Sequence, residues 1–217
     1  MRAAIVGAFF HDRPSERVRF GRALAEVTHR DIRAVEGALY VAEMAAACVA
    51  ATQETSRQSI QIQARKVVTD DRLAGAIDAA VELAQSGTCI QDAAQTIGTS
   101  GYVVHSTAIA TLIFLRSGHS VMPALAEIIS VGGDTDSNAA ILGAWLGALH
   151  GEAGLSEQLL NQIHDGPFGP SHLRALAARL ADPTLKLPSY SPLHALVRNL
   201  LLYPVVLGHG FRRLLPF

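Results

Sequence analysis

Apolar positions along most of the chain recur at spacings of three and four residues, the period of a helix that buries one face. The pattern is clearest after Asp31, where Glu36 and Glu43 lie off the apolar face. A second run begins at Thr69-Asp70-Asp71, whose side chains are typical helix caps, and ends near Gly87. No stretch alternates convincingly with the period of a strand. The pattern therefore predicts an all-α fold.

Capping residues and glycines predict further helices. We expect one compact multi-helix domain over residues 1–217, in which residues 188–217 form an apolar C-terminal extension. The additional helices are expected at residues 92–97 and 102–116, after Ser120, after the turn at residues 132–138, at residues 156–163 and 170–181, and from Pro192 to a break at Pro204.

The densest polar stretch is the turn Gly132-Gly133-Asp134-Thr135-Asp136-Ser137-Asn138, which precedes an apolar helix. The glycines let the backbone turn tightly, and Asp136 or Ser137 can cap the following helix. Asp134 and Asp136 can also converge on one hard cation, with Ser137 adding a hydroxyl oxygen. Spacing alone leaves both interpretations open, an ordinary helix start and a cation site.

Two other kinds of site are excluded by the same residues. An EF-hand needs a glycine where Ala139 stands and a bidentate glutamate where Trp145 stands. A Ser-His-Asp triad would need His105 and Ser106 to point the same way, but adjacent residues leave a helix in different directions.

The helix after the turn carries small residues every four positions. Gly143 and Gly147 lie on this ridge, beside a parallel row of alanines. Small residues on one helix face allow another backbone to approach closely. We therefore expect Gly147 to be packed against a neighbouring backbone, so that a leucine there would overpack the fold.

Composition limits which cellular compartment and which kinds of partner we expect. The formal net charge is −1 and no stripe of Lys and Arg is present, so we expect no nucleic-acid partner. Cys48 and Cys89 are not in a CxxC pair, which favours reduced thiols and a cytoplasmic location. The apolar stretch 199–211 is short and contains Pro204, so we expect no membrane partner.

The turn and its Gly/Ala-rich helix resemble the ADP-ribosylglycohydrolase family (dinitrogenase reductase-activating glycohydrolase-like), whose hallmark is Gly-Gly-Asp-Thr-Asp-Thr/Ser before such a helix. Residues 1–7 resemble the tail of the family's Gly-Asn-Gly-x-x-Met-Arg segment. Residues 27–38 resemble its histidine segment, and residues 98–103 resemble its loop near the adenosine. The resemblance implies these substrate contacts: Met1, Arg2, His29, Ser100, Gly101 and Tyr102.

Residue type alone leaves other roles open for two of these positions. It favours a capping or core histidine for His29, whereas Tyr102 is equally compatible with core packing and a ligand contact. Thr69-Asp70-Asp71 matches the family's early metal motif in letters but lies after His29, so we interpret it as a cap.

The family uses two magnesium ions, and the resemblance implies Asp134, Asp136 and Ser137 as ligands of part of that site. The family's early Thr-Asp-Asp motif would precede Met1, so we expect the family fold to be incomplete at the N-terminus. The general acid and base stay unassigned. We expect weak or no activity from this chain alone, and an uncovered apolar face that favours self-association or a partner chain.

The resemblance implies a magnesium-dependent hydrolase that cleaves the glycosidic bond between ADP-ribose and a protein side chain or small molecule. The alternative is a non-catalytic member that binds ADP-ribose or is structural. Metal-dependent release of ADP-ribose distinguishes the two.

Overall fold

The computed structural model describes residues 1–214, which form helices and connecting loops without a strand. This confirms the all-α fold. The helices are α1 (Ala3–Phe9), α2 (Pro14–Glu26), α3 (Ile32–Val49), α4 (Arg57–Arg65), α5 (Asp71–Gln85), α6 (Ile90–Ile97), α7 (Val103–Ser117), α8 (Val121–Ser130), α9 (Thr135–His150), a 3₁₀ helix η1 (Glu152–Gly154), α10 (Glu157–Leu160), α11 (Pro170–Ala181) and α12 (Pro192–Leu214).

The chain divides into two compact units, Met1–Ser156 and Glu157–Phe217. The first unit contains α1 to α9 and the hydrophobic core. The second contains α10, α11 and α12, and the expected apolar extension at residues 188–217 falls within it.

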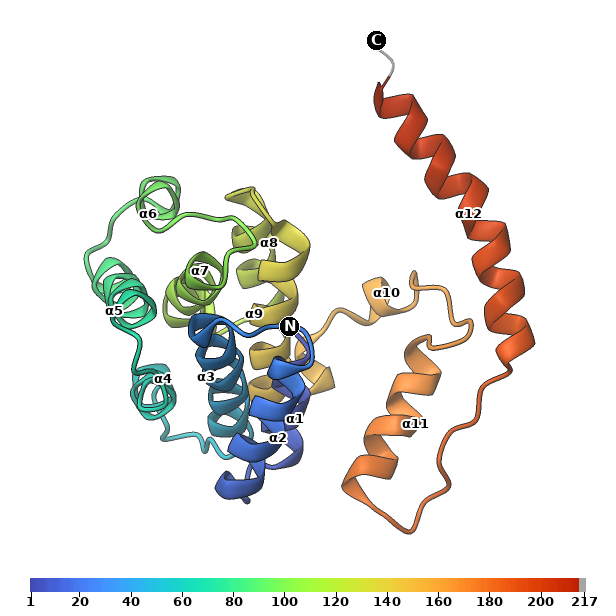
Figure 1. Ribbon diagram of the computed structural model, residues 1–217, viewed down its shortest axis with the longest axis horizontal. Coiled ribbons are helices and arrows are strands. Elements are labelled where there is room, and N and C mark those ends of the chain that lie inside the picture. The colour runs from blue at the N-terminus through green and yellow to red at the C-terminus, as the bar shows by residue number, and fades with distance from the viewer. Residues whose placement is uncertain (215–217) are drawn as a thin grey trace. The chain divides into compact units, whose positions relative to one another are not determined.

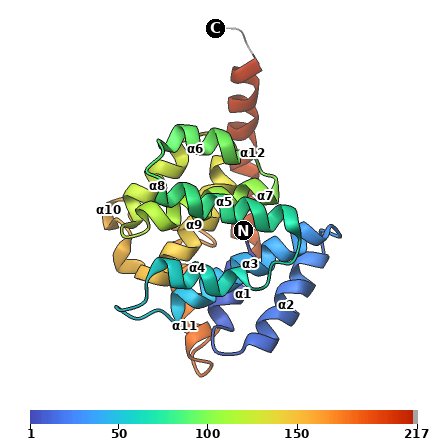
Figure 2. The same cartoon turned by 90° about the vertical axis from the view of Figure 1, so that its left-hand side faces the viewer.

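Helices α3, α7 and α9 form the centre of the first unit (Figures 1 and 2). Tyr40 of α3 and Thr111 of α7 share a hydrogen bond of 2.8 Å between their hydroxyls. Trp145 of α9 donates its indole N–H to the carbonyl of Val41 at 3.1 Å. Its ring also packs edge-on against Tyr40 and Phe114. These buried contacts lock the three helices together.

The contacts between them show that the three central helices point in the same general direction. Gly37 of α3 lies against Val103 at the start of α7, whereas Tyr40, further along α3, reaches Thr111, further along α7. The first turn of α9 likewise contacts Thr99, just before α7. The N-terminal ends of α3, α7 and α9 therefore gather at one end of the bundle.

Helices α1, α2 and α4 are absent from the sequence-based prediction. The first two cover α3 through close contacts: Gly7 of α1 lies directly against the backbone of Ala42. Arg17 of α2 forms a buried two-point ion pair with Glu43 of α3, with N–O distances of 2.7 and 2.9 Å. Burial of a charge is tolerated here because its partner and further hydrogen bonds are supplied.

The prediction that a neighbouring backbone packs on the small residues of α9 is wrong. A methyl group added at Gly147 would meet no atom within 4 Å among the residues described, so no backbone packs there. At Gly143 it would meet a side-chain atom of Leu125 at 3.5 Å, an ordinary contact. A close backbone approach is made at Gly7 instead, where α1 lies against the backbone of α3.

The expected break at Pro204 is also wrong. Helix α12 continues through this proline as one element. Proline removes one intrahelical hydrogen bond and crowds the preceding turn. Because the flanking residues of α12 are exposed, water can satisfy the freed carbonyl, and the helix continues.

Candidate active site

Two segments far apart in the sequence meet at the N-terminal end of the central helices. The carbonyl of Thr99, in the loop Gly98–Tyr102, accepts hydrogen bonds from the amide of Asp134 and from Nδ2 of Asn138, each at 2.9 Å. Asn138 is fully buried in the first turns of α9. One carbonyl thus ties the loop before α7 to the acidic turn before α9.

Glycines make this approach possible. Gly133 has φ +79°, in the left-handed region, and a side chain there would collide with Thr99. A side chain at Gly101 would collide with the carboxylate of Asp134. The loop therefore lies directly against the first of the two acidic residues.

Asp134 and Asp136 lie close to each other. Asp134 precedes α9 and Asp136 lies in its first turn, so neither Asp136 nor Ser137 occupies the cap position. The pKa of Asp136 lies below its ordinary value, first because its carboxylate shares a hydrogen bond with the Asp134 carboxyl. Backbone amides of Ser137 and of Asp136 itself add to the effect. Two adjacent carboxyl groups thus gather several oxygen atoms at this turn.

The oxygen donors here fit magnesium by type. Asp134 and Asp136 supply carboxylates and Ser137 a hydroxyl, and magnesium commonly uses one or two carboxylates with water or substrate completing its shell. Among residues 1–214, no group of three or more His, Cys, Asp and Glu side chains is placed to hold a metal. Two carboxylates and one hydroxyl are fewer donors than the six that magnesium takes, so water or substrate oxygens would have to supply the others.

Asn138 lies beneath the acidic turn and was not among the predicted site residues. Its Oδ1 atom is buried without a hydrogen-bond partner among the described residues, although its Nδ2 atom is bonded to Thr99. A buried unpaired polar atom is costly, so an amide at this place calls for an explanation. The available signal was its position four residues after Asp134, on the same helix face.

Arg2 and His29 come together through a residue that the prediction did not single out. Arg2 donates to the hydroxyl of Thr28 at 2.8 Å, and that hydroxyl lies 2.8 Å from Nδ1 of His29. Met1 is adjacent and exposed. This exposed cluster lies just before α3, at the end of the bundle where the acidic turn is found. Within residues 1–214, no hydrogen bond joins the cluster directly to the acidic turn.

Ser100 and Tyr102 surround His105, at the start of α7. The hydroxyl of Ser100 lies 2.8 Å from Nδ1 of His105, and the Tyr102 ring packs edge-on against the same imidazole. The guanidinium of Arg72 lies 5.5 Å from the centre of the Tyr102 ring. The half-buried Tyr102 is thus held in place at the edge of the loop.

Thr69-Asp70-Asp71 caps α5, as predicted. Asp70 accepts a hydrogen bond from the amide of Leu73 at 2.9 Å. Glu36 of α3 accepts the amides of Thr69 and Asp70 and the Thr69 hydroxyl. Burial works to raise the pKa of Glu36, but these hydrogen bonds outweigh it and hold that pKa below its ordinary value. The segment thus has a structural role in joining α3 to α5.

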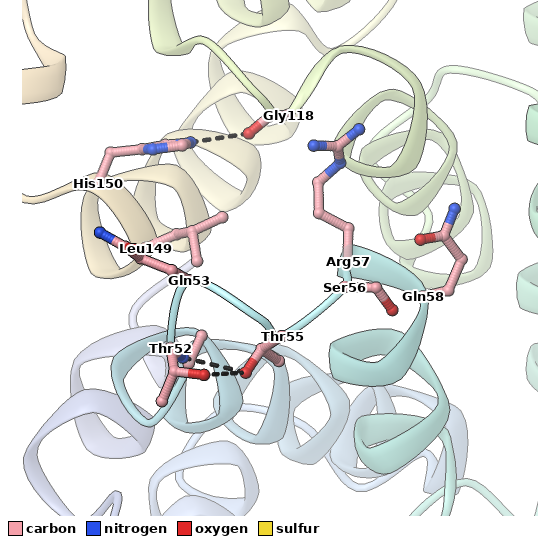
Figure 3. Close-up of a pocket in the computed structure, with 10 residues that line it drawn as sticks. Thr52, Gln53, Thr55, Ser56, Arg57, Gln58, Gly118, Leu149 and His150 are labelled. Atoms are coloured by element: carbon pink, nitrogen blue, oxygen red, sulfur yellow. Dashed lines mark hydrogen bonds between the residues drawn. The ribbon is translucent and has the colours of Figure 1, made fainter.

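A separate hollow of about 490 Å³ lies at the opposite end of the bundle, near the C-terminal ends of α3, α7 and α9 (Figure 3). His150 is hydrogen-bonded to the carbonyl of Gly118 at 2.7 Å, and Arg57 to the carbonyl of Leu115. Two of the side chains that line the hollow, His150 and Arg57, are thus bonded to the C-terminal end of α7.

The helical bundle, with an acidic turn and a glycine loop at its helix starts, defines an all-α protein with an oxygen-donor site. The profile of the ADP-ribosylglycohydrolase family matches residues 1–188, and the chain belongs to this family of glycosidase-type hydrolases that act on ADP-ribose linkages. A search among curated proteins finds no match. Within residues 1–214, no helix is both long and apolar enough to cross a membrane.

Proposed function

We propose that this chain hydrolyses the glycosidic bond between ADP-ribose and a protein side chain or small molecule, with magnesium held by Asp134, Asp136 and Ser137. The observation that carries the proposal is the junction between the loop Gly98–Tyr102 and the acidic turn. It sets two carboxylates beside a backbone loop that has no side chain in the way at Gly101.

The chain's own residues would hold and orient the ligand. Magnesium, when bound, supplies positive charge that orients hydroxyls and lowers the pKa of water. Arg2 and His29 offer donors for the ligand's phosphate or ribose oxygens, and Ser100 adds a hydroxyl. Tyr102 offers a ring face for the base. Together these residues would form the wall of the ADP-ribose site.

We further propose a cytoplasmic location. Cys48 and Cys89 are both free, with Cys48 buried and Cys89 exposed. Burial raises the pKa of the Cys48 thiol to about 12, which keeps it protonated and unreactive. Free thiols of this kind are typical of a reducing compartment.

The test is calorimetric titration of ADP-ribose into the 217-residue chain with and without magnesium chloride, paired with chromatography of ADP-ribose released from ADP-ribosylated arginine and serine peptides. An Asp134→Asn, Asp136→Asn double variant should lose the magnesium response. Asp92→Asn is the control, because Asp92, like Asp136, is an exposed acid in the first turn of a helix, and this variant should retain the magnesium response.

The outcomes separate the two functions. Magnesium-dependent release that the double variant loses supports hydrolysis. Magnesium-dependent binding without release favours the alternative, a non-catalytic ADP-ribose-binding protein. Binding that is equal with and without magnesium, or equal in parent and double variant, overturns the proposed metal site.

A further inference from the structure

The imidazole of His105, in the first turn of α7, is held by alternate residues of the loop Gly98–Tyr102. Gly98, with φ +89°, lies so close that a methyl group added to it would stand 2.8 Å from Nδ1 of His105. The hydroxyl of Ser100 lies 2.8 Å from the same nitrogen. The Tyr102 ring packs edge-on against the imidazole, with the ring centres 5.3 Å apart. Every second residue of the loop thus contacts one side chain of α7.

The hydroxyl of Ser100 is the exposed part of this arrangement. A serine hydroxyl has one donor and two acceptor positions. The amide of Tyr102 donates to it at 3.3 Å, and Nδ1 of His105 takes a second position. The backbone is fixed as well, because the carbonyl of Ser100 accepts the hydroxyl of the buried Ser106 at 3.1 Å. One hydrogen-bonding position with a set direction is therefore left for a ligand.

We propose that His105 is a positioning residue, which fixes the Ser100 hydroxyl in the direction that meets a ribose or phosphate oxygen of the ligand. A hydroxyl on an exposed loop otherwise rotates, and ordering it on binding costs free energy. Because His105 orders it beforehand, that cost is removed from the binding step. This role rests on the proposed function, since ADP-ribose is the ligand whose oxygens Ser100 would meet.

A nucleophilic role for the same pair fits the contacts less well. A serine that is activated by a histidine needs a third group to orient that histidine through its other nitrogen. Among residues 1–214, no hydrogen bond reaches Nε2 of His105, and the ring is held by packing against Gly98 and Tyr102 instead. The contacts thus favour holding the Ser100 hydroxyl over activating it.

A double-mutant cycle tests this role through calorimetric titration of ADP-ribose into the 217-residue chain in magnesium chloride. Ser100→Ala removes the hydroxyl, whereas His105→Phe keeps a ring beside Tyr102 and removes Nδ1. We expect each variant to weaken binding about three- to tenfold, the effect of one hydrogen bond. The double variant should bind no more weakly than Ser100→Ala, because His105 has nothing to position once the hydroxyl is gone.

Further variants separate the hydrogen bond from packing. His105→Asn places a polar atom near the Ser100 hydroxyl without the ring, so it should bind ADP-ribose more tightly than His105→Phe. Ser86→Ala is the matched control, because Ser86 is another exposed serine with a hydrogen-bonded hydroxyl, and it should keep the parent affinity. Fluorescence of the buried Trp145, the single tryptophan, reports whether each variant folds. If His105→Phe does not fold, His105→Leu takes its place in the cycle.

Three results overturn the positioning role while the parent still binds ADP-ribose. The first is equal affinity in the parent and His105→Phe. The second is a double variant whose loss is the product of the single losses, which would mean that His105 acts independently of Ser100. The third is equal weakening by His105→Asn and His105→Phe, which would assign the effect to ring packing.

Failure of the proposed function has a different signature. A parent chain that binds no ADP-ribose overturns the proposed function together with this role. Binding without release of ADP-ribose rejects hydrolysis, whereas the cycle between Ser100 and His105 still decides the positioning role.

Discussion

The two units of the chain use apolar helices in opposite ways. In α7, Ile109, Leu112 and Phe114 are fully buried between neighbouring helices. In α12, Leu200 and Phe211 are more than 60% exposed. Both helices have a strongly apolar sequence, so hydrophobicity alone does not decide burial. The difference teaches that burial depends on whether another element meets the apolar face.

The first unit supplies such neighbours and the second does not. Polar anchors such as the Trp145–Val41 and Tyr40–Thr111 hydrogen bonds hold the central helices together. In residues 157–213, by contrast, Gly169 alone is buried. Stability measured in solution should therefore come almost entirely from residues 1–156.

The largest expected effect is loss of the buried ion pair. Glu43→Ala leaves Arg17 charged and buried without its partner, so we expect a loss of ~3–5 kcal/mol in the free energy of unfolding. Urea denaturation measures it. Glu26→Ala is the control, because Glu26 forms an exposed pair with Arg22 and should cost under ~1 kcal/mol. Equal losses for the two variants would contradict the burial of this pair.

A pair of leucine variants tests the comparison between the two units directly. Leu112→Ala opens a cavity in the core and should cost ~2–5 kcal/mol. Leu200→Ala changes an exposed side chain and should stay within ~0.5 kcal/mol of the parent. Thermal and urea denaturation measure both. A large cost at Leu200 would show that α12 is covered in solution.

A smaller effect is expected at Glu36, and it should depend on pH. The pKa of Glu36 is lower in the folded chain than its ordinary value of 4.5, so its contribution is present above that value and is lost as pH falls through the folded pKa. At pH 7, Glu36→Gln should cost ~1.5 kcal/mol through loss of hydrogen bonds to a charged acceptor.

Urea denaturation of parent and Glu36→Gln across pH 3 to 7 checks this prediction. The difference in the free energy of unfolding between parent and variant should narrow below about pH 4.5, because the parent carboxylate becomes protonated and resembles the amide. A difference that stays constant over this range would show that the charge of Glu36 does not hold the start of α5.

The smallest expected effect is a gain at Gly147. Because a methyl group there meets open space, Gly147→Ala should stabilise the chain by up to ~1 kcal/mol through helix propensity. Gly7→Ala is the opposing control, since a methyl group there would collide with the backbone of Ala42. If thermal denaturation showed Gly147→Ala to be less stable than Gly7→Ala, the result would support the expected close packing against α9.

Much of the fold could be predicted from local sequence. Periodicity and capping residues identified α3, α5 and α7 and the all-α class. The structure differs where a helix has a weak local signal, as in α1 and α4, and where a glycine pattern suggested packing. Small residues permit a close approach but do not create one, which is why Gly7 and not Gly147 meets a backbone.

The candidate site divides in the same way. The sequence alone determined the all-α class, the family resemblance and the closeness of Asp134 and Asp136, which follows from their spacing in one turn. Tertiary structure decided that Thr99 joins this turn, that Asn138 is buried beneath it and that Thr28 links Arg2 to His29. Local spacing acts through short stretches of backbone, whereas the Arg2–Thr28 and Thr99–Asn138 hydrogen bonds join residues 26 and 39 positions apart, so they exist only once the helices have packed.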